Sequence, residues 1–166
     1  MNPKPNRSLE LQSYNGNNIS NFIDADPSPG MIAFQRQHNP YLNPNFTSVV
    51  ELSPATGRYN CHGLVFASRR TNLDSPGQPV DIDDLLNWDF YKPIVTPPQL
   101  GDIVVYRHGK TMEIDHTGFI CRVEKIGETP IIFVWSKWGA LGEFEHRVKH
   151  CIYFNDCEIE YWRLQT

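Results

Sequence analysis

Long apolar runs are missing from this sequence of 166 residues. No stretch approaches the roughly 18 apolar residues that a transmembrane helix needs, so we expect no association with a membrane. No apolar stretch follows the first residues either, so we expect no secretory signal. The default compartment is therefore the cytoplasm, and delivery of the protein as an effector by a dedicated secretion machine is the alternative.

An excess of basic residues is also missing. The chain has 15 Lys and Arg residues against 19 Asp and Glu residues, which gives a formal net charge of -4. We therefore expect no binding to nucleic acid through charge alone. Hydrophobic residues make up 40% and aromatic residues 12% of the chain, a composition typical of a globular domain rather than of a disordered segment.

Cysteine pairs of the Cys-x-x-Cys type are absent, so a structural zinc site is poorly supported. A set made of Cys61, His62 and His116 lacks a carboxylate or a second thiol pair, so we expect neither a metal nor another cofactor. Without an export signal the thiols are expected to be reduced. The cysteines in question are Cys61, Cys121, Cys151 and Cys157.

The order of predicted elements is helices first and strands later. Residues 1–30 are rich in Asn, Pro, Ser and Asp and predict a polar, loosely ordered N-terminal arm, and residues 31–166 are expected to form a single domain. Within this domain, residues 31–58 predict coil wrapped over the core, with Val49-Val50-Glu51-Leu52 as a candidate short strand. Helices are expected over 58–70 and 80–89, and strands over 102–106, 116–123 and 130–136, with one or two more between 143 and 164. We therefore expect an α+β fold in which helices pack against one side of a small antiparallel sheet.

The first candidate for chemistry is Cys61. Asn60 is a good N-cap, which places Cys61 in the first turn of the expected helix. Unpaired backbone N–H groups and the positive end of the helix dipole lie there, and both favour the thiolate, which is the reactive form of cysteine. The alternative is that Cys61 is an inert core residue.

The candidate general base is His116, at the start of a predicted strand, because a base needs rigid structure that directs its ring at the nucleophile. A third polar group fixes the orientation of such an imidazole. Ser136, at the end of the next strand, is the first choice for this role, and His146 and Glu143 are the alternatives. Trp138 is expected to shield the pair from water. Without these roles, His116 would be an exposed residue at a strand end and Trp138 would belong to the core.

Three segments of the chain carry motifs of one enzyme family. They are Asn60-Cys61-His62-Gly63-Leu64-Val65, Leu100-Gly101-Asp102-Ile103-Val104-Val105-Tyr106 and His116-Thr117-Gly118-Phe119. In this order they resemble the NlpC-type branch of the papain-like cysteine peptidases. The segment Trp135-Ser136-Lys137-Trp138-Gly139 is similar to a segment of papain, with Ser136 in place of the orienting Asn. The sequence departs from the family pattern at Asn60 and His62, where Asp and Ser are usual.

The resemblance implies a papain-like NlpC-type fold and a cysteine peptidase or amidase, with a peptide or amide as its substrate. Most members of the family cleave cell-wall peptides. Cys61 would attack the carbonyl carbon of an amide, isopeptide or ester and form a thioester acyl-enzyme, and His116 would protonate the leaving group. The substrate cleft would be walled by Tyr59, His62 and Trp138.

Two other functions are compatible with the same sequence. Acyl transfer to an amine, as in transglutaminase-like enzymes, would use the same residues as hydrolysis. The rival from another class is a non-catalytic module on the same fold, which would bind a peptide or glycan in an aromatic-lined cleft around Tyr59, Trp135 and Trp138.

Overall fold

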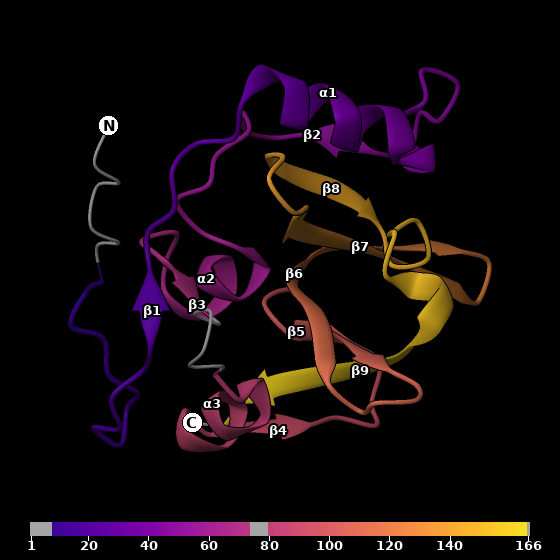
Figure 1. The fold of residues 1–166 in the computed structure, drawn as a ribbon. Helices are drawn as coiled ribbons and strands as arrows, with labels where there is room; N and C mark the ends of the chain where they lie inside the picture. Colours follow the sequence, from indigo (N-terminus) through magenta and orange to yellow (C-terminus); the bar gives the residue numbers. More distant parts are fainter. Residues whose placement is uncertain (1–7, 74–79, 166) are drawn as a thin grey trace.

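A large antiparallel sheet dominates the computed structural model, which describes residues 8–73 and 80–165. Its seven strands follow the order β2-β8-β7-β6-β5-β9-β4. They are β2 (Val50–Glu51), β4 (Tyr91–Pro93), β5 (Ile103–His108), β6 (Ile114–Ile126), β7 (Thr129–Lys137), β8 (Glu143–Arg147) and β9 (Cys157–Leu164). Figure 1 shows that this sheet is strongly curled, with β2 and β8 near one end of the curl and β9 and β4 near the other. A separate two-stranded sheet pairs β1 (Asn21–Phe22) with β3 (Asn72–Leu73).

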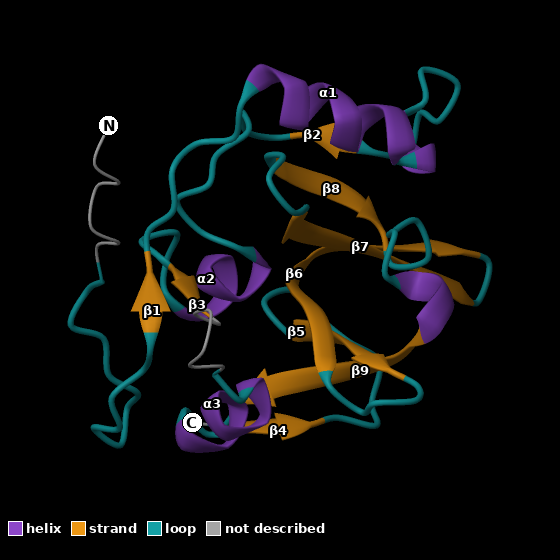
Figure 2. Ribbon diagram, viewed as in Figure 1, coloured by secondary structure: helices purple, strands orange, loops and turns teal. Residues whose placement is uncertain are grey.

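The helices are short and lie around the sheet (Figure 2). They are α1 (Pro29–His38), α2 (Cys61–Phe66) and α3 (Ile82–Trp88), with two single 3-10 turns, η1 (Pro40–Leu42) and η2 (Phe154–Asp156). A polar side chain caps the first turn of each α-helix: Ser28, Asn60 and Asp81 accept a hydrogen bond from a backbone N–H of the helix that follows. No helix in the described part of the chain has the length and apolar character that crossing a bilayer requires.

The expected fold class, helices packed against a small antiparallel sheet, is wrong. The described residues form a β-rich fold in which a seven-stranded sheet and a second two-stranded sheet are accompanied by three short α-helices. Strand β2 lies within the candidate strand at 49–52, whereas the additional strands β1 and β3 have two residues each, too few to show an alternating pattern in the sequence. These short strands are why the sequence underestimated the β content.

Helix α1 lies in the segment for which the sequence predicted only coil. None of its ten residues is buried. The helix contacts the second core through the half-buried Ile32, which is too little for an apolar stripe, and periodicity therefore gives no signal for it. Its cap Ser28 and the proline at its first position, Pro29, are the local features that start it.

The sheet separates two hydrophobic cores. Strand β5 is buried on both faces, and because successive side chains of a strand point to opposite faces, Ile103 and Val105 enter the first core while Val104 and Tyr106 enter the second. The first core also holds apolar residues of α2 and α3, and Leu11 and Ile19 from the predicted N-terminal arm. The second core lies on the other face and contains residues of β7, β8 and the segment after β8.

Candidate functional site

Cys61 is the first residue of α2, and the prediction that Asn60 caps this helix is confirmed. The Asn60 Oδ1 accepts a hydrogen bond from the Gly63 N–H at 2.8 Å and another from the Leu73 N–H at 3.2 Å. The Asn60 Nδ2 donates to the Leu73 carbonyl oxygen. One side chain therefore caps α2 and ties its start to β3.

Gly63 allows this close approach. A Cβ at Gly63 would lie only 1.9 Å from the carbonyl oxygen of Thr71, so no other residue fits without moving the backbone. The helix packs against β6 and β7. Cys61 is consequently held at the point where α2 meets these two strands.

The Cys61 thiol is half-buried, and its surroundings shift its pKa in opposite directions. Burial raises the pKa of Cys61 to about 11, while the backbone N–H groups of Thr117 and His62 and the ammonium of Lys137 favour the thiolate. The Thr117 N–H lies beyond the end of the β6–β7 ladder, whose pairing reaches Gly118 and Ser136. The thiol therefore sits near the point where β6 and β7 separate, with the Thr117 N–H as a hydrogen-bond donor and the Lys137 ammonium within electrostatic reach.

Lys137 is the residue of this site that the sequence analysis did not assign. It is completely buried, its Nζ donates to the carbonyl oxygens of Thr56 at 2.9 Å and Gly139 at 2.7 Å, and it lies 5.5 Å from the ring centroid of Tyr59. Burial lowers the pKa of Lys137 to about 8, and the charge of Cys61 acts in the opposite direction. Since Nζ has four tetrahedral positions, one taken by carbon and two by these hydrogen bonds, one position is left for proton exchange.

The His116 side chain points to the face of β6 that carries the second core. It pairs with Tyr106, a residue of the second core, whereas Thr117 pairs with Val105 of the first core and bonds through Oγ1 to the Nδ1 of His62 at 3.0 Å. The His116 ring stacks on Tyr153 with 4.4 Å between centroids. It is completely buried, and neither ring nitrogen has a hydrogen-bond partner among the described residues. No hydrogen bond between Cys61 and His116 is formed.

The environment keeps His116 neutral. Burial holds the pKa of His116 well below its usual value, and the nearby His146 and His62 lower it further.

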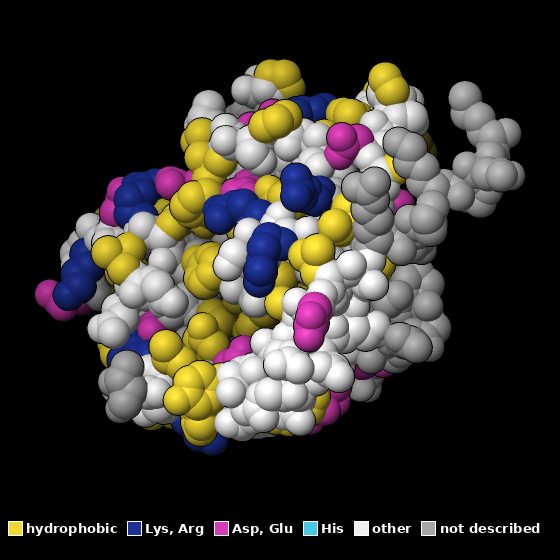
Figure 3. Space-filling view, turned by 90° about the vertical axis from the view of Figure 1, so that its left-hand side faces the viewer, with side chains coloured by type: hydrophobic (Ala, Val, Ile, Leu, Met, Phe, Trp, Pro, Cys, Tyr) yellow, Lys and Arg dark blue, Asp and Glu magenta, His cyan; other side chains and the backbone are white. Residues whose placement is uncertain are grey.

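On the face shown in Figure 3, Lys and Arg side chains gather near the middle among hydrophobic side chains, and no histidine of the described residues is visible. This agrees with the burial of His62, His116 and His146.

Ser136 bonds to His146 and not to His116. The Ser136 Oγ lies 2.8 Å from the His146 Nε2, and the His146 Nδ1 lies 2.9 Å from the Arg147 carbonyl oxygen. A carbonyl oxygen only accepts, so Nδ1 carries the proton and Nε2 accepts from the Ser136 hydroxyl. The Trp138 Nε1–H donates to the same Oγ at 3.1 Å. Ser136 thus belongs to a buried polar chain in the second core.

Of the remaining predicted site residues, some lie in the second core and others lie near Lys137. Trp138 is buried in the second core and stacks on Phe144 with 4.6 Å between centroids. Tyr59 lies on the Lys137 side, and its hydroxyl donates to Glu143. The Glu143 carboxylate also accepts from Arg69 Nε at 2.6 Å and from Trp135 Nε1 at 2.6 Å, so it has several partners and none of them is His116.

His62 borders a pocket of about 590 Å³. Burial lowers the pKa of His62 to about 4, so its imidazole is neutral at physiological pH. Four carboxylate residues also line the pocket, of which Asp83 is paired with Arg107 at 2.7 Å. The lining residues with acidic side chains are Asp81, Asp83, Glu113 and Asp115.

Comparisons with protein-family models, with curated proteins and with solved structures find no match for this chain. The resemblance to NlpC-type peptidases therefore stays a prediction from motifs.

The described residues offer two groups of side chains with chemical potential. The first group is a cysteine thiol, a buried lysine amine and backbone N–H donors, which together suit nucleophilic catalysis. In the second group, His116, His146 and Cys151 bring ligand atoms within 4.8 Å of one another, a spacing that suits a metal ion.

Proposed function

We propose that the protein is a cysteine hydrolase, a peptidase or amidase, in which Cys61 is the nucleophile and Lys137 the proton acceptor. The observation that carries this function is the completely buried Lys137 acting on the half-buried Cys61 thiol where β6 and β7 separate. A lysine with a lowered pKa is a suitable general base, and nucleophile–lysine pairs occur in hydrolases of other folds.

The pKa of Lys137, lowered to about 8 by burial, makes the neutral amine accessible near neutral pH. The amine accepts the proton of the Cys61 thiol, and the sulfur attacks the carbonyl carbon of the substrate, so that a C–S bond forms as the carbonyl becomes an oxyanion. The Thr117 and Cys61 N–H groups beside the sulfur are placed to donate to this oxyanion. The Lys137 ammonium then returns the proton to the leaving nitrogen as the C–N bond breaks.

Water completes the cycle. It attacks the thioester carbonyl, the carboxylic acid leaves, and the Cys61 sulfur regains its proton through Lys137. An amine in place of water would give acyl transfer with the same residues. The sequence assigned the proton transfer to His116, but its ring faces the second core, so Lys137 is the better supported acceptor.

A small activated ester tests this function without knowledge of the natural substrate. With p-nitrophenyl acetate we expect a burst of nitrophenol close to one equivalent, and peptide mass spectrometry should find the acetyl group on Cys61. Cys61→Ala should abolish the burst and Lys137→Met should slow it strongly. The matched control is Cys121→Ser, which changes another half-buried cysteine, located in β6. This variant should react like the wild type.

The rival function, a non-catalytic binding module, makes the opposite prediction. Folded wild-type protein would then show no burst, or its acetylation would be spread over cysteines and lysines without preference for Cys61. Either result would overturn the assignment of Cys61 as nucleophile.

A further inference from the structure

The buried imidazole of His116 lacks the hydrogen bonds that buried polar groups normally form among the residues around them. Its side chain is completely buried, and both ring nitrogens are without hydrogen-bond partners among the described residues. Leaving a polar group buried and unpaired is energetically unfavourable, so such a group calls for an explanation. A ligand that binds a ring nitrogen would provide one.

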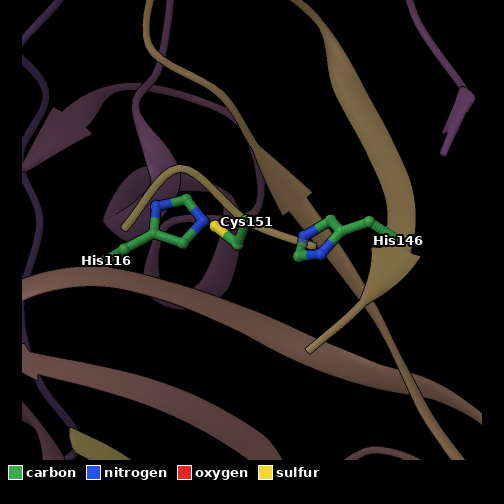
Figure 4. Close-up of side chains that lie close together, drawn as sticks. All are labelled: His116, His146 and Cys151. Atoms are coloured by element: carbon green, nitrogen blue, oxygen red, sulfur yellow. The ribbon is translucent and has the colours of Figure 1, made fainter. Parts of the chain in front are cut away.

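Two other metal-binding side chains face this imidazole. The ligand atoms of His116, His146 and Cys151 all lie within 4.8 Å of one another, and all three residues are completely buried. Figure 4 shows the Cys151 sulfur between the two imidazole rings, each of which turns a nitrogen toward it. The three residues come from β6, from β8 and from the segment that follows β8. Side chains from separate parts of the chain thus converge on one point.

His146 is already oriented as a metal-bound histidine usually is. Its Nδ1–H donates to the Arg147 carbonyl oxygen at 2.9 Å, which fixes the tautomer and leaves the Nε2 lone pair available. In the structure the Ser136 hydroxyl donates to this lone pair at 2.8 Å. A metal ion bound at Nε2 would replace this hydrogen bond.

From this arrangement we propose that His116, His146 and Cys151 form a binding site for Zn²⁺. Two neutral imidazoles and one thiolate are a donor set that favours zinc and disfavours Mg²⁺ and Ca²⁺, which prefer oxygen ligands. The bonds that zinc forms to nitrogen and sulfur are about 2.0–2.3 Å long, so the three side chains would close on the ion by small rotations. The proposed zinc site does not rest on the proposed hydrolase function, because none of its three ligands takes part in that chemistry.

Binding requires the loss of one proton. The Cys151 thiol gives up its proton to solvent as the S–Zn bond forms, and both imidazoles bind in their neutral forms. The hydroxyl of Tyr106 and the backbone N–H of Tyr153 lie close enough to the Cys151 sulfur to favour its thiolate, although burial raises the pKa of Cys151 to about 12 in the absence of an ion. The metal thus supplies the positive charge that the buried thiolate requires.

Metal content of the whole protein tests this site. Purified protein is loaded with Zn²⁺, dialysed, and analysed for zinc by mass spectrometry. We expect close to one equivalent in the wild type, and less than a tenth of that in Cys151→Ser and His146→Gln. The matched controls Cys157→Ser and His150→Gln change neighbouring residues of the same type and should keep the full equivalent.

Cobalt provides a readout that does not depend on the variants folding. Co²⁺ bound by the wild type should show a thiolate-to-cobalt charge-transfer band, and removal of the metal by a chelator should lower the melting temperature of the protein. Wild-type protein that retains no zinc, or that binds Co²⁺ without a thiolate band, would overturn the site. So would a folded Cys151→Ser variant that retains a full equivalent of zinc.

Discussion

Ser136 and Lys137 are neighbours in β7 and face opposite sides of the sheet. Ser136 joins His146 and Trp138 in the second core, whereas Lys137 reaches the carbonyls of Thr56 and Gly139 on the Cys61 side. The sequence analysis selected Ser136 from this segment, whereas the proposed function uses its neighbour Lys137. Strand alternation places the two residues on opposite faces, yet the face on which the helix carrying Cys61 docks is decided by long-range packing that no local pattern contains.

The same difficulty applies to His116. Its position on a strand beside the segment that contacts Cys61 was predictable, because both motifs were recognisable in the sequence. The direction of its ring was not, since it follows from the partner strands: Tyr106 beside His116, and Val105 beside Thr117. The prediction that His116 serves Cys61 as a base stays untested.

Replacing Ser136 with Ala tests the function of the polar chain in the second core. The change removes the acceptor of the Trp138 N–H and the donor to His146, so the free energy of unfolding should fall by about 1–3 kcal/mol. Acetylation and alkylation of Cys61 should keep their wild-type rates. Urea denaturation and thiol labelling of the same preparation measure both quantities.

A second Ser–His pair provides the control. Ser48 and His150 are also 2.8 Å apart but are only partly buried, so Ser48→Ala should cost less stability than Ser136→Ala. A Ser136→Ala protein of wild-type stability with slow Cys61 chemistry would show instead that Ser136 orients a catalytic residue.

At the scale of elements, a sequence pattern was most informative where an element contributes to a core. Strands β5, β6 and β7 and helices α2 and α3 carry buried apolar residues and were expected close to their observed positions. Strand β2 lies within the candidate strand at 49–52, although both of its residues are exposed. Helix α1, which has no buried residue, was not expected, because it depends on its cap rather than on an apolar pattern.

The start of α2 is the element on which the proposed site depends most. Asn60→Ala should lower the free energy of unfolding by about 1–2 kcal/mol through loss of the cap. It should also slow labelling of Cys61, because Asn60 ties the helix start to Leu73 and so holds the thiol beside Thr117 and Lys137. Denaturant unfolding and the iodoacetamide labelling rate of Cys61 check both effects.

Ser28 offers a matched cap. It accepts a hydrogen bond from the Met31 N–H at 3.2 Å at the start of α1, which carries no site residue. Ser28→Ala should therefore cost stability without changing the labelling of Cys61. Equal effects of the two variants on Cys61 would show that the cap of α2 does not position the thiol.

At the scale of the whole molecule, Glu143 connects distant parts of the chain. Its carboxylate accepts hydrogen bonds from Tyr59 and Arg69, which are distant in the sequence, and from Trp135, which lies on the neighbouring strand β7. Burial alone would raise the pKa of Glu143, but the hydrogen bonds from Arg69 and Tyr59 outweigh it and hold the pKa below its usual value.

This shift predicts how stability depends on pH. A carboxyl with a lowered pKa contributes stability that is complete above the unfolded pKa of about 4.3 and is lost as the pH falls through the folded pKa. Glu143→Gln should therefore be less stable than the wild type at neutral pH, by about 1–3 kcal/mol. The difference in stability between the variant and the wild type should become smaller in acid. Urea denaturation at neutral pH and at a pH below the folded pKa of Glu143 measures it.

Glu124 serves as the comparison, because its side chain and that of its partner Arg122 are both close to half exposed. Exposed ion pairs contribute little, so Glu124→Gln should match the wild type at both pH values. A stability difference for Glu143→Gln that stays constant into acid would mean that Glu143 is not ionised in the folded protein.

The most direct test of the proposed Cys61–Lys137 pair is the pH dependence of Cys61 labelling by iodoacetamide, followed by peptide mass spectrometry. Wild type, Lys137→Met and His116→Gln are compared with a chelator present throughout, so that metal binding at His116 does not contribute. The groups that titrate near the thiol are Lys137, His62, Cys151 and Tyr153. The apparent pKa belongs to the coupled pair rather than to one residue.

Loss of the Lys137 ammonium should raise the pKa of Cys61 and move its labelling profile to higher pH, with the rate at a fixed pH falling about tenfold for each unit. His116→Gln should leave the profile where it is in the wild type. A profile that shifts in His116→Gln and stays unchanged in folded Lys137→Met would contradict the pairing of Cys61 with Lys137. It would favour His116 as the catalytic base instead.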